Sequence, residues 1–147
     1  MTNESRTTFT IGYEKRSVDD LIWILKAREV DRVVDVRLRP FSRRPDFSKT
    51  RLSAALAAAG VVYEHAGALG NPDEIRELYL SGDAEAGHRA FREHLQNGAS
   101  GALSELANTS NETTVALLCL ERDPQRCHRQ VIADALAEHK DIRIVHL

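Results

Sequence analysis

The sequence has little cysteine, few aromatic residues and no long hydrophobic run. Two cysteines in 147 residues are too few for the disulfide framework of a small secreted domain, so we expect free thiols. No stretch approaches the roughly 20 consecutive apolar residues of a membrane-spanning helix, and we therefore expect no membrane partner. The polar start of the chain lacks the apolar segment of a secretion signal, which predicts a cytoplasmic protein.

The formal net charge is only −2, but the charges are unevenly distributed. A value so close to zero argues against a protein that binds polyanions over its whole surface. Basic residues are nevertheless concentrated between positions 37 and 51, where the only acid is Asp46. Because a ligand experiences the field of the nearest surface, we expect anions to bind here. The basic residues of this segment are Arg37, Arg39, Arg43, Arg44, Lys49 and Arg51.

Length and composition predict one globular domain. A chain of 147 residues can bury a substantial core but is short for two domains. Hydrophobic residues make up 42% of the chain and charged residues 29%, as in ordinary globular proteins. We therefore expect a single domain over residues 1–147, with residues 1–6 as a frayed tail.

Short apolar segments alternate with amphipathic segments along the chain. This alternation predicts the α/β class, as a single three-layer domain with a mainly parallel sheet of about five strands flanked by helices. The predicted strands are residues 7–11, 33–37, 61–65, 113–119 and 142–146. The predicted helices begin near Ser17, Ser48, Asn71 and Asp83, and continue with residues 99–107 and 124–139.

The ends of the predicted strands indicate where a ligand binds. In a parallel sheet all C-terminal strand ends lie at one edge, which is where ligands bind in this class of protein. We therefore expect side chains from distant parts of the sequence to meet there. These side chains are Tyr13, Asp35, Arg37, His65 and Cys119.

The segment from Val115 to Ala133 carries the densest set of reactive side chains. An apolar strand reaches Cys119, and Asp123-Pro124 then supplies a helix cap and a proline suited to the first helical position. Backbone N–H groups at a helix N-terminus lack partners, so anions bind there and thiol pKa values fall there. We predict an active or binding site at this turn.

Three side chains are candidates for proton transfer: Glu121, His128 and Asp35. His128 is either a general acid or base that acts near neutral pH or a core-facing residue whose ring is hydrogen-bonded to a neighbouring strand. Glu121 either forms a surface ion pair or activates water or binds a sugar hydroxyl. Asp35 follows a hydrophobic strand and needs a cationic partner, for which Arg37 and Arg129 are the candidates.

The two cysteines allow several interpretations. Cys119 is either a buried small apolar residue or a reactive thiol, and Cys127 falls in the first turn of the predicted helix. If the two thiols meet, His65 and His128 are the nearest imidazoles to complete a zinc site. The separation of the cysteines matches no common zinc pattern, however, so the sequence predicts no metal site. It identifies no cofactor either.

The arginines are the candidates for holding a ligand. Prolines stiffen the segment that follows Arg37, so its guanidinium groups are either simply solvated or held as fixed forks for phosphate oxygens. The residues expected to bind the anion are Arg37, Arg39, Arg43 and Arg129. The residues expected to stack on a base or sugar are Tyr13 and Tyr63.

Several short motifs together resemble one protein family. The motifs are Thr10-Ile-Gly-Tyr13, Asp35-Val-Arg37, Arg39-Pro-Phe-Ser-Arg43 with Pro45 and Phe47, Gly60 with Tyr63, Cys119-x-Glu121, and Pro124-x-x-Cys-His-Arg129. With them the chain resembles the domain of unknown function 488 family, from about Thr8 to the end of the last helix. The cysteine motifs around the proline are the specific part. The resemblance implies the fold and the location of a site, but the family carries no established reaction.

A looser similarity is to rhodanese-like domains. These also have an aspartate-valine-arginine strand and a cysteine after a buried strand, and backbone amides encircle the nucleophilic cysteine. In the present chain no glycine follows Cys119 in the turn, and Glu121 would oppose a thiolate. Rhodanese-like thiol chemistry at Cys119 is therefore an alternative to the leading hypothesis.

The leading hypothesis is an enzyme that acts on a phosphate-bearing small molecule or nucleic-acid component at the C-terminal edge of the sheet. A second interpretation is a non-catalytic module that binds nucleotide or nucleic acid through the same basic segment. The third is the thiol chemistry described above. The sequence leaves open whether the protein is an enzyme, and it indicates no oligomeric state.

Overall fold

Five strands form one parallel sheet in the order β3-β2-β4-β1-β5. The computed structural model describes residues 6–139 and 141–147. The strands are β1 (Arg6–Gly12), β2 (Arg32–Asp35), β3 (Val62–His65), β4 (Val115–Cys119) and β5 (Ile142–His146). All five occur where the sequence predicts them, within a few residues. The predicted tail lies outside the described residues, except for Arg6, which begins β1.

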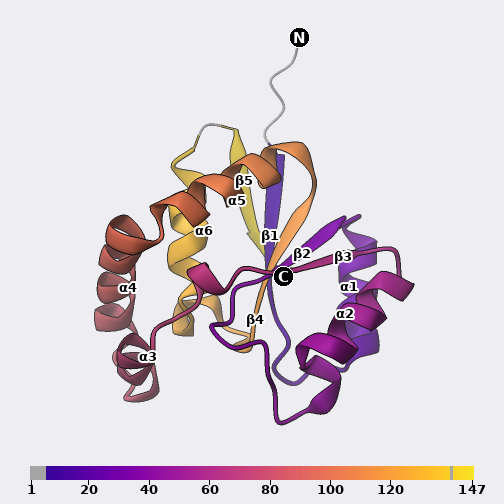
Figure 1. Cartoon of the computed structure of the whole chain (residues 1–147), viewed down its shortest axis with the longest axis horizontal. Coiled ribbons are helices and arrows are strands. Elements are labelled where there is room, and N and C mark those ends of the chain that lie inside the picture. The colour runs from indigo at the N-terminus through magenta and orange to yellow at the C-terminus, as the bar shows by residue number, and fades with distance from the viewer. Residues whose placement is uncertain (1–5, 140) are drawn as a thin grey trace.

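Helices cover both faces of the sheet, as Figure 1 shows. Helices α1 (Val18–Ala27) and α2 (Lys49–Ala58) lie on one face. The other face carries α3 (Asp73–Leu80), α4 (Ala84–Gly98), α5 (Ser100–Glu112) and α6 (Arg129–Ala137). The α/β class with a flanked parallel sheet is therefore confirmed. None of the helices within the described residues combines the length and the apolar character needed to cross a bilayer.

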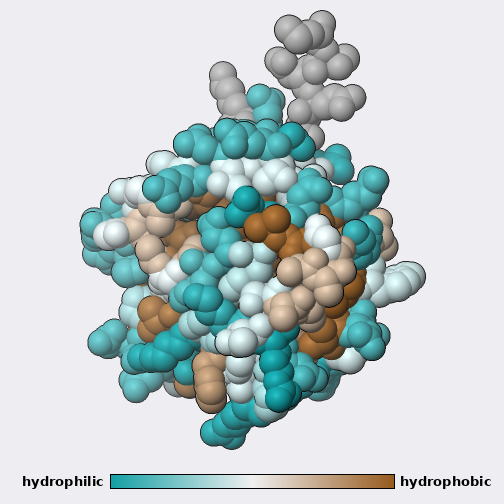
Figure 2. Space-filling model, turned by 45° about the vertical axis from the view of Figure 1, so that its right-hand side comes forward, coloured by the Kyte–Doolittle hydropathy of each residue, from teal (hydrophilic) through white to brown (hydrophobic). Residues whose placement is uncertain are grey.

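Strand β4 lies at the centre of the sheet and divides the core in two. All five of its residues are buried. Successive side chains of a strand point to opposite faces, so Leu117 packs in the cluster below α4, α5 and α6, and Leu118 packs in the cluster below α1 and α2. Outside this core, the face drawn in Figure 2 is mostly hydrophilic, with hydrophobic residues in separate patches.

The order of the strands places a reversal of the chain at the centre of the sheet. From β1 the chain runs outwards through β2 to the edge strand β3, and it returns to β4 beside β1 before it reaches the other edge at β5. In open parallel sheets, ligands bind beyond the C-terminal ends of the strands at such a reversal. The residues that follow β1, β2 and β4 are therefore the ones placed to form a site.

The predicted continuous helix over residues 124–139 is wrong, because the structure divides it. A short 3₁₀ turn, η3 (Pro124–Arg126), ends at Cys127, whose backbone is extended, and α6 begins only at Arg129. The Asp123 carboxylate accepts a hydrogen bond from the backbone N–H of Gln125, which closes the short turn locally. The interruption turns the side chains of Cys127 and His128 into the core.

The glycine at the end of β1 allows the turn after β4 to approach closely. The N–H of Tyr13 donates to the Cys119 carbonyl and that of Glu14 to the Leu120 carbonyl, at 3.2 and 2.9 Å. A Cβ atom on Gly12 would lie 1.9 Å from the carbonyl oxygen of Glu121. Because these contacts are between backbone atoms, the absence of a side chain at Gly12 sets the position of the turn.

We predict that Gly12→Ala lowers the free energy of unfolding by about 1–3 kcal/mol or more, because the turn has to move away from the new methyl group. Urea denaturation followed by circular dichroism measures this change. The matched control is Gly101→Ala in α5, where a Cβ meets nothing within 4 Å, and alanine is expected to stabilise the helix by about 0.5–1 kcal/mol or to have no effect. Equal stability of both variants would contradict the prediction.

Candidate functional site

A pocket of about 690 Å³ lies at the C-terminal edge of the sheet. Its walls come from the arginine loop (residues 37–44), from α3 with the preceding Asn71, and from the turn between Cys119 and His128. The structure therefore brings together two segments that are some 80 residues apart in the sequence and that the sequence analysis placed at one edge.

Positive charge dominates the lining of the pocket. Six arginines and two carboxylates face it. Such a surplus in a concave surface raises the local concentration of anions. The arginines are Arg37, Arg39, Arg43, Arg44, Arg76 and Arg126, and the carboxylates are Asp73 and Glu121.

Two of these arginines hold the arginine loop in place. Both terminal nitrogens of Arg39 donate to the carboxylate of Asp73, at 3.1 and 2.9 Å, and link the loop to the start of α3. The hydrogen bonds from Arg39 lower the pKa of Asp73. Arg44 donates to the backbone carbonyls of Tyr13 and Arg16. The predicted ligand Arg39 thus lines the pocket with its charge already paired.

Three other arginines of the lining are exposed. The side chains of Arg43, Arg76 and Arg126 make no hydrogen bond or ion pair with any other residue that the structure describes. They come from the arginine loop, from α3 and from η3 respectively, so they approach the pocket from three directions. Arg43 was a predicted anion ligand, and it is one of the three guanidinium groups that are free to bind one.

Asp35 and Arg37 form a buried ion pair at the end of β2. The Asp35 carboxylate is fully buried, and it accepts hydrogen bonds from Nε and Nη2 of Arg37 at 2.9 and 2.7 Å. It also accepts from the Arg37 backbone N–H and from the Tyr63 hydroxyl. Burial disfavours the charge on Arg37, but the contacts with Asp35 outweigh burial and raise the arginine pKa. Asp35 thus positions Arg37, and it is not the proton-transfer group that the sequence suggested.

The two tyrosines predicted to stack on a base are both engaged elsewhere. The ring of Tyr13 is buried and stacks on Phe47 with centroids 4.5 Å apart. Tyr63 does not line the pocket, and burial, reinforced by its bond to Asp35, raises its hydroxyl pKa. The aromatic side chain of α3 that does line the pocket is Tyr79, whose hydroxyl lies 2.7 Å from Nδ1 of His88.

Arg129 does not reach the pocket. It is fully buried, and its terminal nitrogens donate to the backbone carbonyls of Glu121 and Arg122 at 2.6 and 3.3 Å. The break before α6 directs this side chain towards the turn instead of towards solvent. Arg129, which was predicted to bind the anion, instead holds the turn that carries Glu121.

The start of α6 is also not an open anion site. The N–H of Arg129 donates to Sγ of Cys127, and the N–H groups of Gln130 and Val131 donate to the carbonyls of Cys127 and His128. These amides are used by the chain itself, because Cys127 and His128 fold back over the first turn. The anion site predicted at the helix N-terminus near Pro124 is consequently not formed by these amides.

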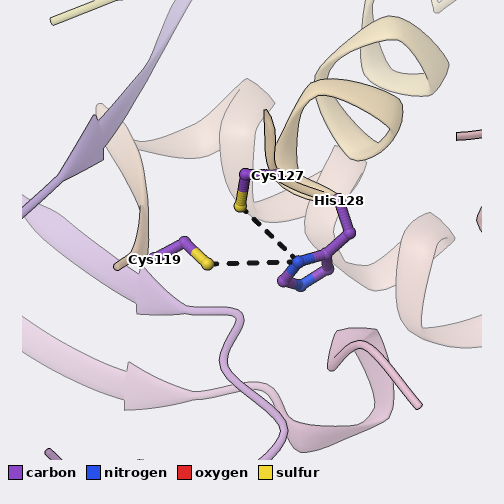
Figure 3. Close-up of side chains that lie close together, drawn as sticks. All are labelled: Cys119, Cys127 and His128. Atoms are coloured by element: carbon purple, nitrogen blue, oxygen red, sulfur yellow. Dashed lines mark hydrogen bonds between the residues drawn. The ribbon is translucent and has the colours of Figure 1, made fainter. Parts of the chain in front are cut away.

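Cys119, Cys127 and His128 line the buried floor of the pocket, and their side chains converge, as Figure 3 shows. Nδ1 of His128 lies 4.0 Å from Sγ of Cys119 and 3.6 Å from Sγ of Cys127. Nε2 of the same ring lies 2.8 Å from the Val36 carbonyl, which can only accept a hydrogen bond. Nε2 therefore carries a proton, and Nδ1 faces the two sulfurs. This contact also agrees with the core-facing interpretation of His128.

Glu121 lies beside this cluster and lines the pocket. Its Oε2 accepts a hydrogen bond from the Cys119 thiol over 3.5 Å. Unlike Asp35 and Asp73, it has no cationic partner among the described residues. Of the three predicted proton-transfer residues, Glu121 is therefore the carboxylate that a ligand can reach.

The buried cluster shifts the titration of its members. A hydrogen bond with the Cys127 side chain, and then burial, raise the pKa of the Cys119 thiol well above its usual value. Burial lowers the pKa of His128, but the Cys119 sulfur and the Val36 carbonyl raise it by more. A thiol that stays protonated at neutral pH is the opposite of the activated thiolate of a nucleophilic cysteine. This counts against rhodanese-like chemistry at Cys119.

Sequence reasoning missed Arg76, Tyr79, Arg126 and Asn71. The first two are three residues apart on α3 and so share a helix face, a spacing that could have indicated a common role. Asn71 is largely buried, and its side-chain oxygen has no partner among the described residues. His65, which was predicted at the same edge, instead lines a second hollow next to α5.

We predict that Asp35→Asn lowers the free energy of unfolding by about 3–5 kcal/mol, because it leaves the buried guanidinium of Arg37 without its counter-charge. The matched control is Glu64→Gln, which removes one partner of the solvent-exposed pair with Arg32 and is expected to cost less than about 1 kcal/mol. Chemical denaturation of both variants measures the difference. Similar losses in the two variants would show that Asp35 does not stabilise Arg37 as described.

No curated protein and no solved structure matches this chain. A family model described as "Domain of unknown function DUF488" matches residues 17–136, which extend from the start of α1 almost to the end of α6 and include both walls of the pocket. Because the match covers most of the chain, the protein belongs to the DUF488 family.

Proposed function

We propose that the protein is an enzyme that acts on a phosphate-bearing small molecule bound in the arginine-lined pocket. One observation carries the proposal: three exposed, unpaired arginines surround a floor that holds a free carboxylate beside a buried cysteine–histidine cluster. Arginine-rich rims recognise anions, and a reactive floor beneath such a rim is what distinguishes an active site from a charged surface.

The guanidinium groups of the exposed arginines suit a phosphate ligand better than positive charge alone would. A guanidinium donates two parallel hydrogen bonds to phosphate oxygens, and such charge-assisted bonds are roughly twice as strong as neutral ones. Arg43, Arg76 and Arg126 belong to three separate segments, so they can contact different oxygens of one group. The Arg39–Asp73 link fixes the loop that carries Arg43.

The size and lining of the pocket favour a ligand larger than inorganic phosphate. A volume of about 690 Å³ is in the range of pockets that hold a nucleotide-sized molecule. Phe41, Tyr79 and Leu80 supply apolar surface for a base or another non-polar group. Asn71, whose buried side-chain oxygen has no partner among the described residues, also lines the pocket.

Glu121 is the residue we assign to proton transfer. The other two carboxylates near the pocket are neutralised by Arg39 and Arg37, whereas Glu121 contacts only the neutral thiol of Cys119. The Glu121 carboxylate is therefore accessible to a proton on a molecule bound in the pocket. In this role it would remove a proton from the water or hydroxyl group that attacks the bound substrate.

We predict that Arg43→Ala and Arg126→Ala each weaken the binding of pyrophosphate and of a nucleoside diphosphate by about 10- to 100-fold, because a hydrogen bond to a charged group contributes about 1.5–3 kcal/mol. Isothermal titration calorimetry at low and moderate salt measures the affinities. Arg143→Ala, on β5 and outside the pocket lining, removes the same charge and is expected to have little effect. A uniform loss in all three variants would show a general charge effect instead of a binding site.

We predict that Glu121→Gln keeps the affinity of the wild type for these phosphate compounds within a few fold, but slows phosphate release from them by about 10²- to 10⁴-fold, the usual contribution of a general base. The matched control is Glu77→Gln on α3, outside the pocket lining. Binding without turnover by the wild type, across monophosphates, diphosphates and pyrophosphate, would favour the non-catalytic binding module instead.

A further inference from the structure

The floor of the pocket has the chemistry of a metal site. The potential ligand atoms of Cys119, Cys127 and His128 all lie within 4.8 Å of one another. Two sulfurs and one imidazole nitrogen are the ligand types that zinc and other thiophilic metals prefer. We propose that these three residues bind a divalent metal ion of the zinc type and leave its fourth position open to water or to a bound anion. This inference does not depend on the proposed function.

The distances match those between the ligands of a tetrahedral ion. With zinc–sulfur bonds near 2.3 Å and zinc–nitrogen bonds near 2.0–2.1 Å, the sulfur and nitrogen ligands of one ion lie about 3.5–3.6 Å apart. Nδ1 of His128 is 3.6 Å from Sγ of Cys127 and 4.0 Å from Sγ of Cys119. The two nitrogen–sulfur distances are therefore within about 0.5 Å of this spacing, and all three ligand atoms lie within 4.8 Å of one another (Figure 3).

Groups around the cluster hold the ligands in the orientation that a metal requires. Ligating histidines usually donate their second ring N–H to a carbonyl or carboxylate, which aims the first nitrogen at the ion. His128 has this arrangement, because Nε2 donates to the Val36 carbonyl in either protonation state of the ring. The backbone N–H of Arg129 donates to Sγ of Cys127 and would support it as a thiolate.

The cluster supplies three ligands and borders the pocket. Sites with three protein ligands and one exchangeable position are typical of catalytic zinc. The three ligands are buried but line the pocket, so the fourth position is the one that water or a bound anion can occupy. Glu121 lies beside the cluster, with Oε2 3.5 Å from Sγ of Cys119, and is not one of the three ligands.

The sequence suggested these residues as possible zinc ligands, but their spacing argued against a metal site. Cys119 ends β4, whereas Cys127 and His128 lie between η3 and α6, so no short regular spacing marks the set. The interruption of the predicted helix at Cys127 is what turns the second sulfur and the imidazole towards the first sulfur. A continuous helix from Pro124 would have placed these two neighbouring side chains in directions about 100° apart.

The test is metal binding by the full-length chain, reduced, freed of metal with a chelator and titrated with Zn²⁺ against a chromophoric chelator. We expect one ion per chain. Co²⁺ in place of Zn²⁺ should give thiolate charge-transfer bands and the visible bands of a tetrahedral ion. Loss of a group that hydrogen-bonds to a metal ligand typically weakens metal binding by roughly 10- to 100-fold. Cys127→Ser and His128→Asn each remove a ligand itself, so each should weaken zinc binding by more than this. Glu121→Gln, which removes none of the three ligands, should weaken zinc binding far less than either of these substitutions.

The matched control is His65→Asn. The Nε2 atom of His65 also lies 2.8 Å from a backbone carbonyl in the arginine loop, that of Arg37, but the ring is outside the cluster. Its substitution should leave zinc affinity unchanged. Circular dichroism establishes that each variant is folded, and the cobalt spectrum of the wild type tests the thiolate ligands even if a variant fails to fold.

Three results would overturn the proposal. The first is the absence of stoichiometric binding by the reduced wild type. The second is binding that Cys127→Ser and His128→Asn leave unchanged, which would indicate an adventitious ion only. The third is a cobalt spectrum without thiolate bands.

A chain that binds no metal but forms a Cys119–Cys127 disulfide in air would instead have a redox-active thiol pair. Pyrophosphate binding, measured on the metal-free chain, tests the proposed function separately.

Discussion

One hydrogen bond joins the two halves of the candidate site, from Nε2 of His128 to the carbonyl of Val36. Val36 directly follows β2 and precedes the arginine loop, whereas His128 belongs to the turn after β4. Because both groups are buried, breaking this bond would leave a polar group without a partner inside the protein. Together with the pairing of β2 with β4 and the hydrogen bond from the Val36 N–H to the Leu118 carbonyl, this bond holds the arginine loop beside the cysteines.

The arginines of this site fall into two groups that perform different tasks. Arg37 and Arg129 are buried. Arg37 donates hydrogen bonds to Asp35, and Arg129 donates to the backbone carbonyls of the turn after β4. Arg43, Arg76 and Arg126 are exposed and unpaired among the described residues. A buried cation is too costly to leave without partners, so the first group builds the frame. Only the second group has donors to spare for a ligand.

The sequence predicted the features that depend on neighbouring residues. The alternation of apolar and amphipathic segments indicated the sheet and its helices, and Ser17 and Asp83 cap helices as their spacing predicted. Arg129 was placed in the pocket because its position follows a motif, but its side chain is buried and directed elsewhere, whereas Tyr13 lines the pocket with its ring stacked on Phe47. Such directions depend on tertiary packing, which no local pattern contains, and Arg76 was missed for the same reason.

The state of the two thiols links the remaining interpretations. A hydrogen bond with the Cys127 side chain and burial both raise the pKa of the Cys119 thiol, so this thiol resists ionisation. A rhodanese-like nucleophile needs the opposite environment, in which several amides stabilise a thiolate. Within the described residues one amide donates to a sulfur of this cluster, that of Arg129, and its acceptor is Cys127, not Cys119. A bound cation would reverse the balance, because it would stabilise both thiolates at once. The environment that disfavours a free nucleophile at Cys119 is thus compatible with the proposed metal ligand.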